Sequence, residues 1–126
     1  MDAIFAYGTL MRGESRHTVL ASAGPVRIVA AAAQGMMINI GPYPAVLEGD
    51  VPVHGEYCEF EDLSELLPRL DGIEGSGYRR ERVTVTLDGG GQAEAWIYLW
   101  NGTIQDGPRI LSGSWRVHRG RALNPG

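Results

Sequence analysis

The sequence predicts an α+β fold in which about six strands close into a small barrel with short peripheral helices. Apolar, β-branched runs of strand length recur along the 126 residues, whereas helical spacing is confined to short stretches. Strands and helices do not alternate regularly, as they would in a doubly wound sheet. A chain of this length can bury roughly two thirds of its unfolded surface around one core. We therefore expect a single domain over residues 1–126.

The N-terminal segment predicts a strand, a loop and a short helix. Asp2–Tyr7 is an apolar and aromatic run that stops at Gly8, which is typical of a buried strand ending at a turn. After a loop to about residue 13, apolar residues recur at helical spacing within Glu14–Ala23. Ser15 is the expected N-cap of this helix, and Gly24-Pro25 should end it.

The central segment predicts two strands joined by a rigid turn. Propensity leaves helix and strand both open for Val26–Ile40, which contains four consecutive alanines, but its C-terminal half favours a long bent strand. The two prolines of Gly41–Pro44 lack an N–H donor, so this stretch should form a turn that fixes Tyr43. Val51–Glu61 then alternates as a strand does.

The third segment predicts an amphipathic helix over Asp62–Asp71. Its leucines recur at intervals of three and four residues after an acidic start. Pro68 is the weak point of this helix, and the glycine-rich stretch Gly72–Gly77 should break it.

A β-hairpin is expected next. Arg82–Leu87 and Ala93–Trp100 have the composition of strands, and Asp88–Gly91 between them supplies glycines for a turn with positive φ. Beyond Gly102 the sequence is poorly determined by pattern, and from about residue 103 the tail should pack on the domain or fray. The residues expected to hold it are Ile110, Leu111 and Trp115.

Charge and cysteine content exclude several classes of protein. The net charge is −4, and all eleven basic residues are arginines, so no lysine-rich patch is available to follow a nucleic-acid backbone. The single cysteine, Cys58, permits no intrachain disulfide, and no Cys/His spacing suggests zinc. No charged leader or membrane-spanning apolar stretch is present. We therefore expect a cytoplasmic protein without nucleic-acid or membrane partners.

Two features could carry chemistry. The loop Tyr7-Gly-Thr-Leu10 follows a strand, and its glycine could let successive amides surround an anion, although an ordinary glycine turn has the same composition. Glu74 follows the predicted helix, between Ile73 and a glycine. If it is partly buried, its pKa rises toward neutrality, as a general acid/base requires. An exposed loop glutamate is the alternative. Cys58 and the three histidines show no catalytic or metal-binding pattern.

Six short motifs then occur in order over about the first hundred residues. They are Phe5-Ala-Tyr-Gly-Thr-Leu10, Gly41-Pro-Tyr-Pro-Ala45, Val53-His-Gly-Glu-Tyr57, Leu70-Asp-Gly-Ile-Glu-Gly75, Tyr78-Arg79 and Ala95-Trp-Ile-Tyr98. No single motif is specific, but together they resemble the γ-glutamylcyclotransferase-like (AIG2-like) family. The resemblance implies a compact mixed β-barrel with a cavity under the first loop. It also implies release of 5-oxoproline and a free amine from a γ-glutamyl amide, without a metal or cofactor.

The resemblance also implies roles for individual residues. Glu74 would be the acid/base. The amides of Tyr7, Gly8, Thr9 and Leu10 would bind the α-carboxylate of the substrate. Three aromatic residues would line or close the pocket: Tyr43, Tyr78 and Tyr98.

Three other functions remain open from the sequence. A non-catalytic module could use the same pocket to bind a small anionic, glutamyl-like metabolite. A hydrolase could pair Glu74 with a second carboxylate, such as Glu56 or Glu59. A structural role would be favoured if the interior of the barrel were filled and dry.

Overall fold

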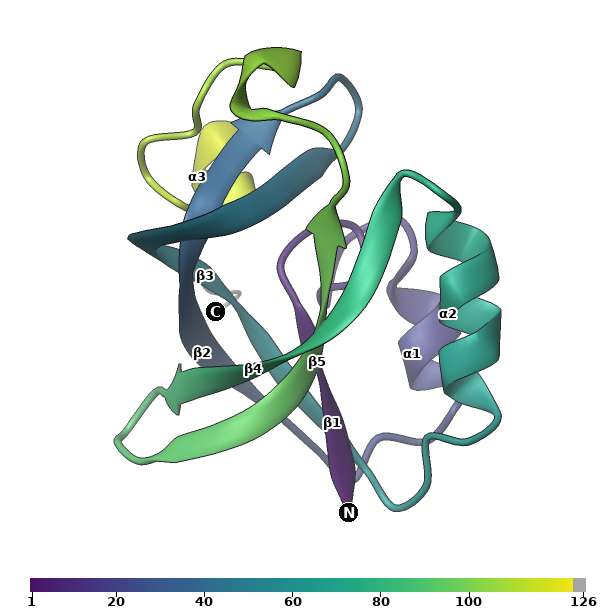
Figure 1. Cartoon of the computed structure of the whole chain (residues 1–126). Helices are drawn as coiled ribbons and strands as arrows, with labels where there is room; N and C mark the ends of the chain where they lie inside the picture. Colours follow the sequence, from purple (N-terminus) through teal and green to yellow (C-terminus); the bar gives the residue numbers. More distant parts are fainter. Residues whose placement is uncertain (124–126) are drawn as a thin grey trace.

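The computed structural model describes residues 1–123 as a closed barrel of five strands in the order β1-β3-β2-β4-β5, with short helices outside it (Figure 1). The strands are β1 (Asp2–Ala6), β2 (Arg27–Asn39), β3 (Pro44–Phe60), β4 (Tyr78–Leu87) and β5 (Gln92–Trp100). Only the β1–β5 pair is parallel, so the barrel is mixed. The predicted α+β barrel is confirmed, with five strands instead of about six, and β3 begins seven residues before the strand predicted at Val51.

β1 closes the barrel and is buried on both faces. It pairs antiparallel with β3 and parallel with β5, where Ile4 lies opposite Trp96. Ala3, Ile4 and Phe5 are each at most 1% exposed. This position explains why the first strand is continuously apolar instead of alternating. The chain leaves β1 at Tyr7 and enters the loop that was singled out in the sequence.

β2 and β3 form a long hairpin whose turn has the predicted place. Ile40 donates its amide to the carbonyl of Tyr43 at 3.2 Å, and Gly41 has a φ of 127°. Pro44, which we expected inside the turn because it lacks an N–H donor and cannot continue a ladder, is instead the first residue of β3 and lies opposite Asn39. A proline is tolerated at a strand's first residue because its missing N–H can face away from the ladder.

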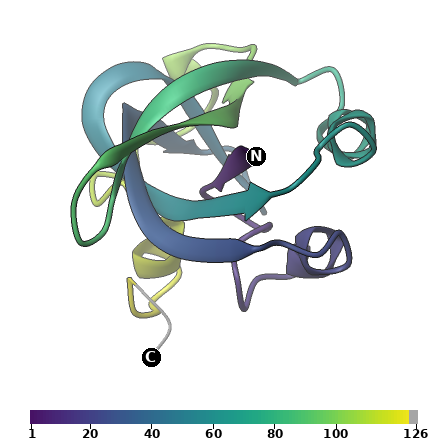
Figure 2. The same cartoon turned by 90° about the horizontal axis from the view of Figure 1, so that it is seen from below.

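α1 (His17–Ala21) and α2 (Leu66–Glu74) lie on one side of the barrel, and α3 (Trp115–His118) lies away from them (Figures 1 and 2). α1 is shorter than predicted. Its N-cap is Arg16 and not Ser15, and no side chain caps it. Short helices of this kind depend on packing, which here buries Leu20.

α2 differs more from its prediction, because it continues through Gly72 and ends only after Glu74. Pro68 is in the first turn of the helix, where a missing N–H has no helical partner to lose. Burial of Leu66 and Leu70 against the barrel outweighs the roughly 1 kcal/mol that a helical glycine costs. The helix stops at Gly75, which has a φ of 76°. Glu74 therefore belongs to the helix and not to a loop.

The hairpin of β4 and β5 is confirmed, with positive φ at all three glycines of its turn. The tail contains a 3-10 turn, η1 (Ile104–Asp106), before α3. Ile110 and Trp115 are buried as predicted, whereas Leu111 is 79% exposed. Within residues 1–123, no helix is long and apolar enough to cross a membrane.

Candidate active site

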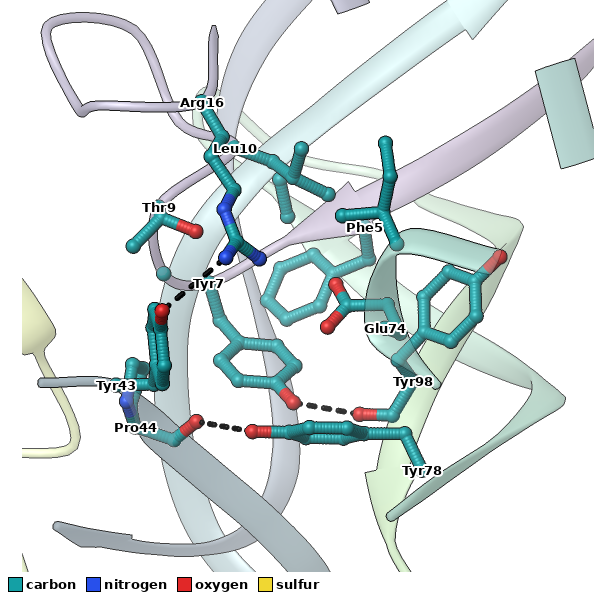
Figure 3. Close-up of a pocket in the computed structure, with 13 residues that line it drawn as sticks. Phe5, Tyr7, Thr9, Leu10, Arg16, Tyr43, Pro44, Glu74, Tyr78 and Tyr98 are labelled. Carbon is teal, nitrogen blue, oxygen red and sulfur yellow. Dashed lines mark hydrogen bonds between the residues drawn. The ribbon is translucent and has the colours of Figure 1, made fainter. Parts of the chain in front are cut away.

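A cavity of about 130 Å³ lies where β1, the 41–44 turn, α2 and the paired ends of β4 and β5 meet (Figure 3). All eight residues that the sequence singled out line it, and none lies elsewhere. The complete lining comprises Phe5, Ala6, Tyr7, Gly8, Thr9, Leu10, Arg16, Tyr43, Pro44, Ile73, Glu74, Tyr78 and Tyr98. The interior at this end of the barrel is therefore hollow and has polar groups, which removes the basis for a purely structural role.

The loop after β1 lines the cavity and is closed by two backbone hydrogen bonds. The amide of Met11 donates to the carbonyl of Gly8 at 3.1 Å, and that of Arg16 donates to the carbonyl of Thr9 at 2.8 Å. These bonds close the loop on itself. Within the described part of the chain, the amides of Gly8, Thr9 and Leu10 make no hydrogen bond, so they are available to an anion.

Gly8 is required for the loop to pass the 41–44 turn. A Cβ atom at this position would lie 2.8 Å from Cγ of Pro44. That separation is shorter than any normal carbon–carbon contact, so a larger residue would displace the loop or the proline. The loop that contains the YGTL motif thus packs directly against the turn that contains the GPYP motif.

Three tyrosines form the walls of the cavity and are held in place by hydrogen bonds (Figure 3). Tyr7 donates its hydroxyl to the carbonyl of Tyr98 at 2.6 Å, and Tyr78 donates to the carbonyl of Pro44 at 3.0 Å. Burial raises the pKa of Tyr78 to about 12, and nearby Glu74 adds to that increase. Tyr98 directs its hydroxyl away from the cavity, toward Asp71 at 2.7 Å. These phenols stay neutral near pH 7.

α2 carries one fixed carboxylate and one free carboxylate, a turn apart. Asp71 accepts two hydrogen bonds from Arg80, at 2.9 and 3.1 Å, in addition to the one from Tyr98. The bonds from Arg80 lower the pKa of Asp71 and tie the helix to β4 and β5. Asp71 therefore fixes the position of Glu74.

Glu74 is half-buried at the edge of the cavity. Among residues 1–123, its carboxylate has no hydrogen-bond donor and no cation within 4 Å. Burial raises the pKa of Glu74, and the positive charge of Arg16 offsets part of the increase. A carboxylate whose pKa is raised takes up a proton more readily than an ordinary glutamate and can still release it.

Sequence reasoning missed Arg16. Its guanidinium enters the cavity from the loop side, donates to the hydroxyl of Tyr43 at 3.1 Å and lies 4.9 Å above that ring (Figure 3). The sequence placed Arg16 in the expected helix over Glu14–Ala23 and gave it no role, whereas the structure places it at the N-cap of α1.

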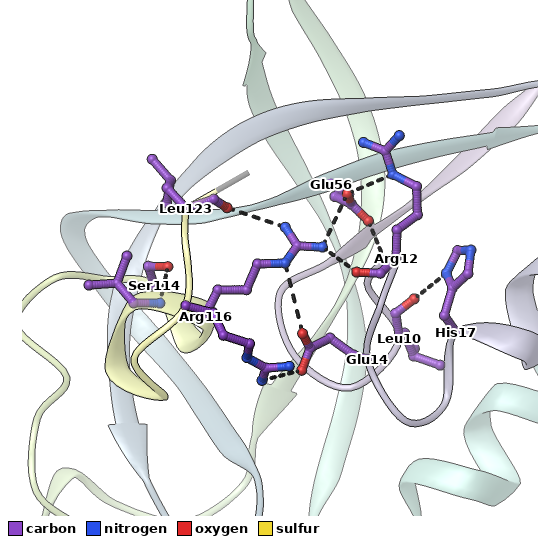
Figure 4. A network of polar contacts seen from close by, with 10 residues as sticks. Leu10, Arg12, Glu14, His17, Glu56, Ser114, Arg116 and Leu123 are labelled. Carbon is purple, nitrogen blue, oxygen red and sulfur yellow. Dashed lines mark hydrogen bonds and ion pairs between the residues drawn. The ribbon is translucent and has the colours of Figure 1, made fainter. Parts of the chain in front are cut away.

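The second carboxylates that were considered lie in other environments. Glu56 is fully buried and accepts hydrogen bonds from the amide of Arg12 at 2.8 Å, its Nε at 2.9 Å, and Nη2 of Arg116 at 3.3 Å (Figure 4). Glu59 accepts from Tyr57 at 3.1 Å and lies 3.8 Å from Arg27. Neither lines the cavity, so the paired-carboxylate alternative is not supported.

The network around Glu56 holds the loop after β1. Arg116 of α3 donates to the carbonyl of Arg12 at 2.6 Å and lies 3.9 Å from Glu14. Arg121 donates to Glu14 at 2.8 Å (Figure 4). Buried charges of opposite sign thus connect the loop to β3 and to the C-terminal helix.

Cys58 and His17, in which the sequence showed no catalytic or metal-binding pattern, lie in surroundings typical of residues with a structural role. Cys58 is fully buried in β3, and burial raises its pKa to about 12, which disfavours the reactive thiolate. His17 shares a hydrogen bond with the carbonyl of Leu10 at 2.8 Å. No group of three His, Cys, Asp or Glu side chains in the described residues is arranged to hold a metal ion.

Comparison with known proteins gives a consistent result. The family model for gamma-glutamyl cyclotransferase, AIG2-like, matches residues 4–117. A Vibrio cholerae protein, provisionally named a gamma-glutamylcyclotransferase, is 32% identical over 112 residues, which are 89% of this chain and 93% of that protein. The gamma-L-glutamyl-butirosin B gamma-glutamyl cyclotransferase of Niallia circulans is 31% identical over 108 residues, covering 80% and 68% of the two chains. An AIG2-like protein from Mus musculus shares the fold, with a TM-score of 0.71 at 22% identity over 100% of this chain and 97% of that one.

Proposed function

Because the chain belongs to the gamma-glutamyl cyclotransferase, AIG2-like, family, we propose that it converts a γ-glutamyl amide into 5-oxoproline and a free amine. The observation that carries this proposal is the unpaired, half-buried Glu74 facing the same cavity as the unbonded amides of Gly8, Thr9 and Leu10. One side of the cavity can thus bind an anion while the other moves a proton. A binding module would need the first feature but not the second.

The reaction needs no nucleophile from the protein. The α-amine of the γ-glutamyl group attacks its own γ-carbonyl carbon, a new C–N bond closes the five-membered lactam, and the original amide C–N bond breaks. A well-oriented intramolecular attack can recover roughly 7–11 kcal/mol of the barrier. The protein must therefore bend the substrate, and the rigid tyrosine walls and the loop amides are suited to hold it so.

Glu74 accounts for the proton transfer. As a carboxylate it takes a proton from the substrate's α-ammonium, which makes the amine nucleophilic. It delivers this proton to the departing nitrogen as the amide C–N bond breaks. The ring nitrogen then loses its second proton through Glu74 to the released amine, so the lactam is neutral, the amine leaves as an ammonium ion and the carboxylate is regenerated. The raised pKa of Glu74 favours this cycle because it brings the proton affinity of the carboxylate closer to that of the substrate's α-amine.

The test is turnover of a panel of γ-glutamyl amides, with 5-oxoproline followed by mass spectrometry, for the wild type and Glu74→Gln. The variant keeps the shape of the side chain but cannot accept a proton, so product should fall by a factor of 100 or more, roughly the contribution of a general acid/base. Glu65→Gln is the matched control, since Glu65 lies exposed at the start of the same helix. Turnover should persist in EDTA, because every step is assigned to the substrate and the chain.

Activity retained by Glu74→Gln, at an unchanged melting temperature, would show that another group moves the proton. If the folded wild type binds γ-glutamyl compounds but converts none, the binding-module alternative takes the place of the enzyme.

A further inference from the structure

Arg16 carries a positive charge into the cavity without a carboxylate partner. Within residues 1–123 no Asp or Glu oxygen lies within 4 Å of its guanidinium, whereas Arg12, Arg80 and Arg116 are all paired. Its one polar partner is the neutral hydroxyl of Tyr43. A partly buried guanidinium held over an aromatic ring is prepared to bind an anion.

The cavity has room for only part of a γ-glutamyl amide. Its volume of about 130 Å³ is below the roughly 300–1,000 Å³ of sites that enclose a drug-sized ligand. The amine portion must therefore extend past the rim. Tyr43, 38% exposed, is the pocket tyrosine that reaches the surface, and Arg16 lies above its ring.

A second, more open cleft adjoins the cavity at Tyr43. It has a volume of about 590 Å³ and shares Thr9 and Tyr43 with the first cavity. Arg119 and Trp115 of the C-terminal segment line it, with the guanidinium 5.2 Å above the indole ring. In the described part of the chain Arg119 has no carboxylate within 4 Å. Among the described residues, the cavity and the adjoining cleft thus each have one arginine without a carboxylate within 4 Å, while Glu14, which also lines the cleft, is paired with Arg121.

We propose that the amine portion of the substrate leaves the cavity past Tyr43, and that Arg16 selects amines that carry a carboxylate. This inference rests on the proposed function and deepens it: the substrate class is a γ-glutamyl amino acid or an acidic peptide, not the amide of a neutral or cationic amine. The loop amides hold the glutamyl α-carboxylate, Arg16 holds the carboxylate of the leaving amine, and Arg119 extends the positive potential along the cleft.

Arg16 also affects the ionisation of Glu74, and the experiment must distinguish this effect from substrate selection. Its charge lowers the pKa of Glu74, so its removal changes the rate with every substrate. The ratio of kcat/KM between two substrates cancels this effect, because Glu74 is the same in both reactions. A suitable pair is γ-glutamyl-glycine and γ-glutamyl-glycinamide, which differ only in one carboxylate that becomes a neutral amide.

The experiment measures kcat/KM for this pair with the wild type, Arg16→Gln and Arg16→Lys. The wild type should prefer γ-glutamyl-glycine, and Arg16→Gln should reduce the preference about tenfold, the effect expected when a charge-assisted hydrogen bond is lost. Arg16→Lys keeps the charge and should retain part of the preference. Arg69→Gln, at an exposed arginine of α2, is the control and should not change the ratio.

An unchanged ratio in Arg16→Gln overturns the inference, including the case in which both substrates weaken equally because Arg16 binds the glutamyl half. If the wild type forms no 5-oxoproline from either compound, the proposed function fails, and the same pair is compared by calorimetric titration. Tighter binding of γ-glutamyl-glycine that is lost in Arg16→Gln then still supports the inference. Equal affinities, or no measurable affinity, overturn it.

Discussion

Replacing Glu56 by glutamine should destabilise the protein and loosen the loop that lines the cavity. The carboxylate is fully buried and accepts three hydrogen bonds, two from Arg12 and one from Arg116. Glutamine can still accept the bond from the amide of Arg12. Its amide group, however, would place N–H donors against one of the two guanidiniums, and the negative charge would be gone.

The expected loss of stability follows from the positive charge of the guanidiniums, which stays in place when the carboxylate of Glu56 is removed. Removing one partner of a buried ion pair costs roughly 3–5 kcal/mol. We expect about 3 kcal/mol of unfolding free energy, the lower end of that range, because Glu14 still lies 3.9 Å from Arg116. For a domain of this size the melting temperature should fall by about 10 °C. The loop should also become more mobile, which raises KM more than it lowers kcat.

Urea unfolding of the wild type and Glu56→Gln, followed by circular dichroism, measures the free-energy difference. Glu59→Gln is the control on the same strand, since its partner Arg27 is half exposed and 3.8 Å away; it should cost less than about 1 kcal/mol. A loss below about 1 kcal/mol in Glu56→Gln would refute the assigned role of the network, because so small a value is typical of exposed pairs.

Two further predictions concern the cavity. Gly8→Ala should raise KM strongly and cost about 1–3 kcal/mol of stability, because its Cβ would lie 2.8 Å from Cγ of Pro44; Thr9→Ala, which keeps its amide, should be much milder in the same steady-state assay. The value of kcat/KM should fall on the acid side as Glu74 is protonated, at a pH above the ordinary range of glutamate. Arg16→Gln should move this acidic limb to higher pH, because the charge of Arg16 lowers the pKa of Glu74. Because folding raises the pKa of Glu74, its ionisation costs stability as pH rises through that pKa. Glu74→Gln should therefore melt slightly above the wild type at pH 8, and the difference should vanish below pH 4.

The local parts of the fold could be predicted because they depend on neighbouring residues. The glycines of 88–91 specify their hairpin, and Gly41–Pro44 specifies its turn. The end of α2 could not be read in the same way. Gly72 breaks an isolated helix, and only the burial of Leu66 and Leu70 against the barrel keeps it helical.

The motifs identified the right residues for the cavity but not the residues that support them. Asp71 was part of a quoted motif, yet its bonds reach Arg80 on β4 and Tyr98 on β5, which lie 9 and 27 residues along the chain. Arg16 belonged to no quoted motif, and its contact with Tyr43 joins residues 27 positions apart. Such contacts arise only when the barrel closes, so no local pattern contains them.

The connection between Arg116 and the loop after β1 has a consequence for the synthesis of the chain. The ribosome makes residues 7–16 about a hundred positions before the guanidinium that fixes them. β5, which completes the barrel by pairing with β1, also follows much later. A nascent chain therefore carries the loop after β1 long before it can hold that loop in place. Competence should arise in a single late step, when α3 docks, and a C-terminal fusion that delays docking should delay activity without changing the barrel.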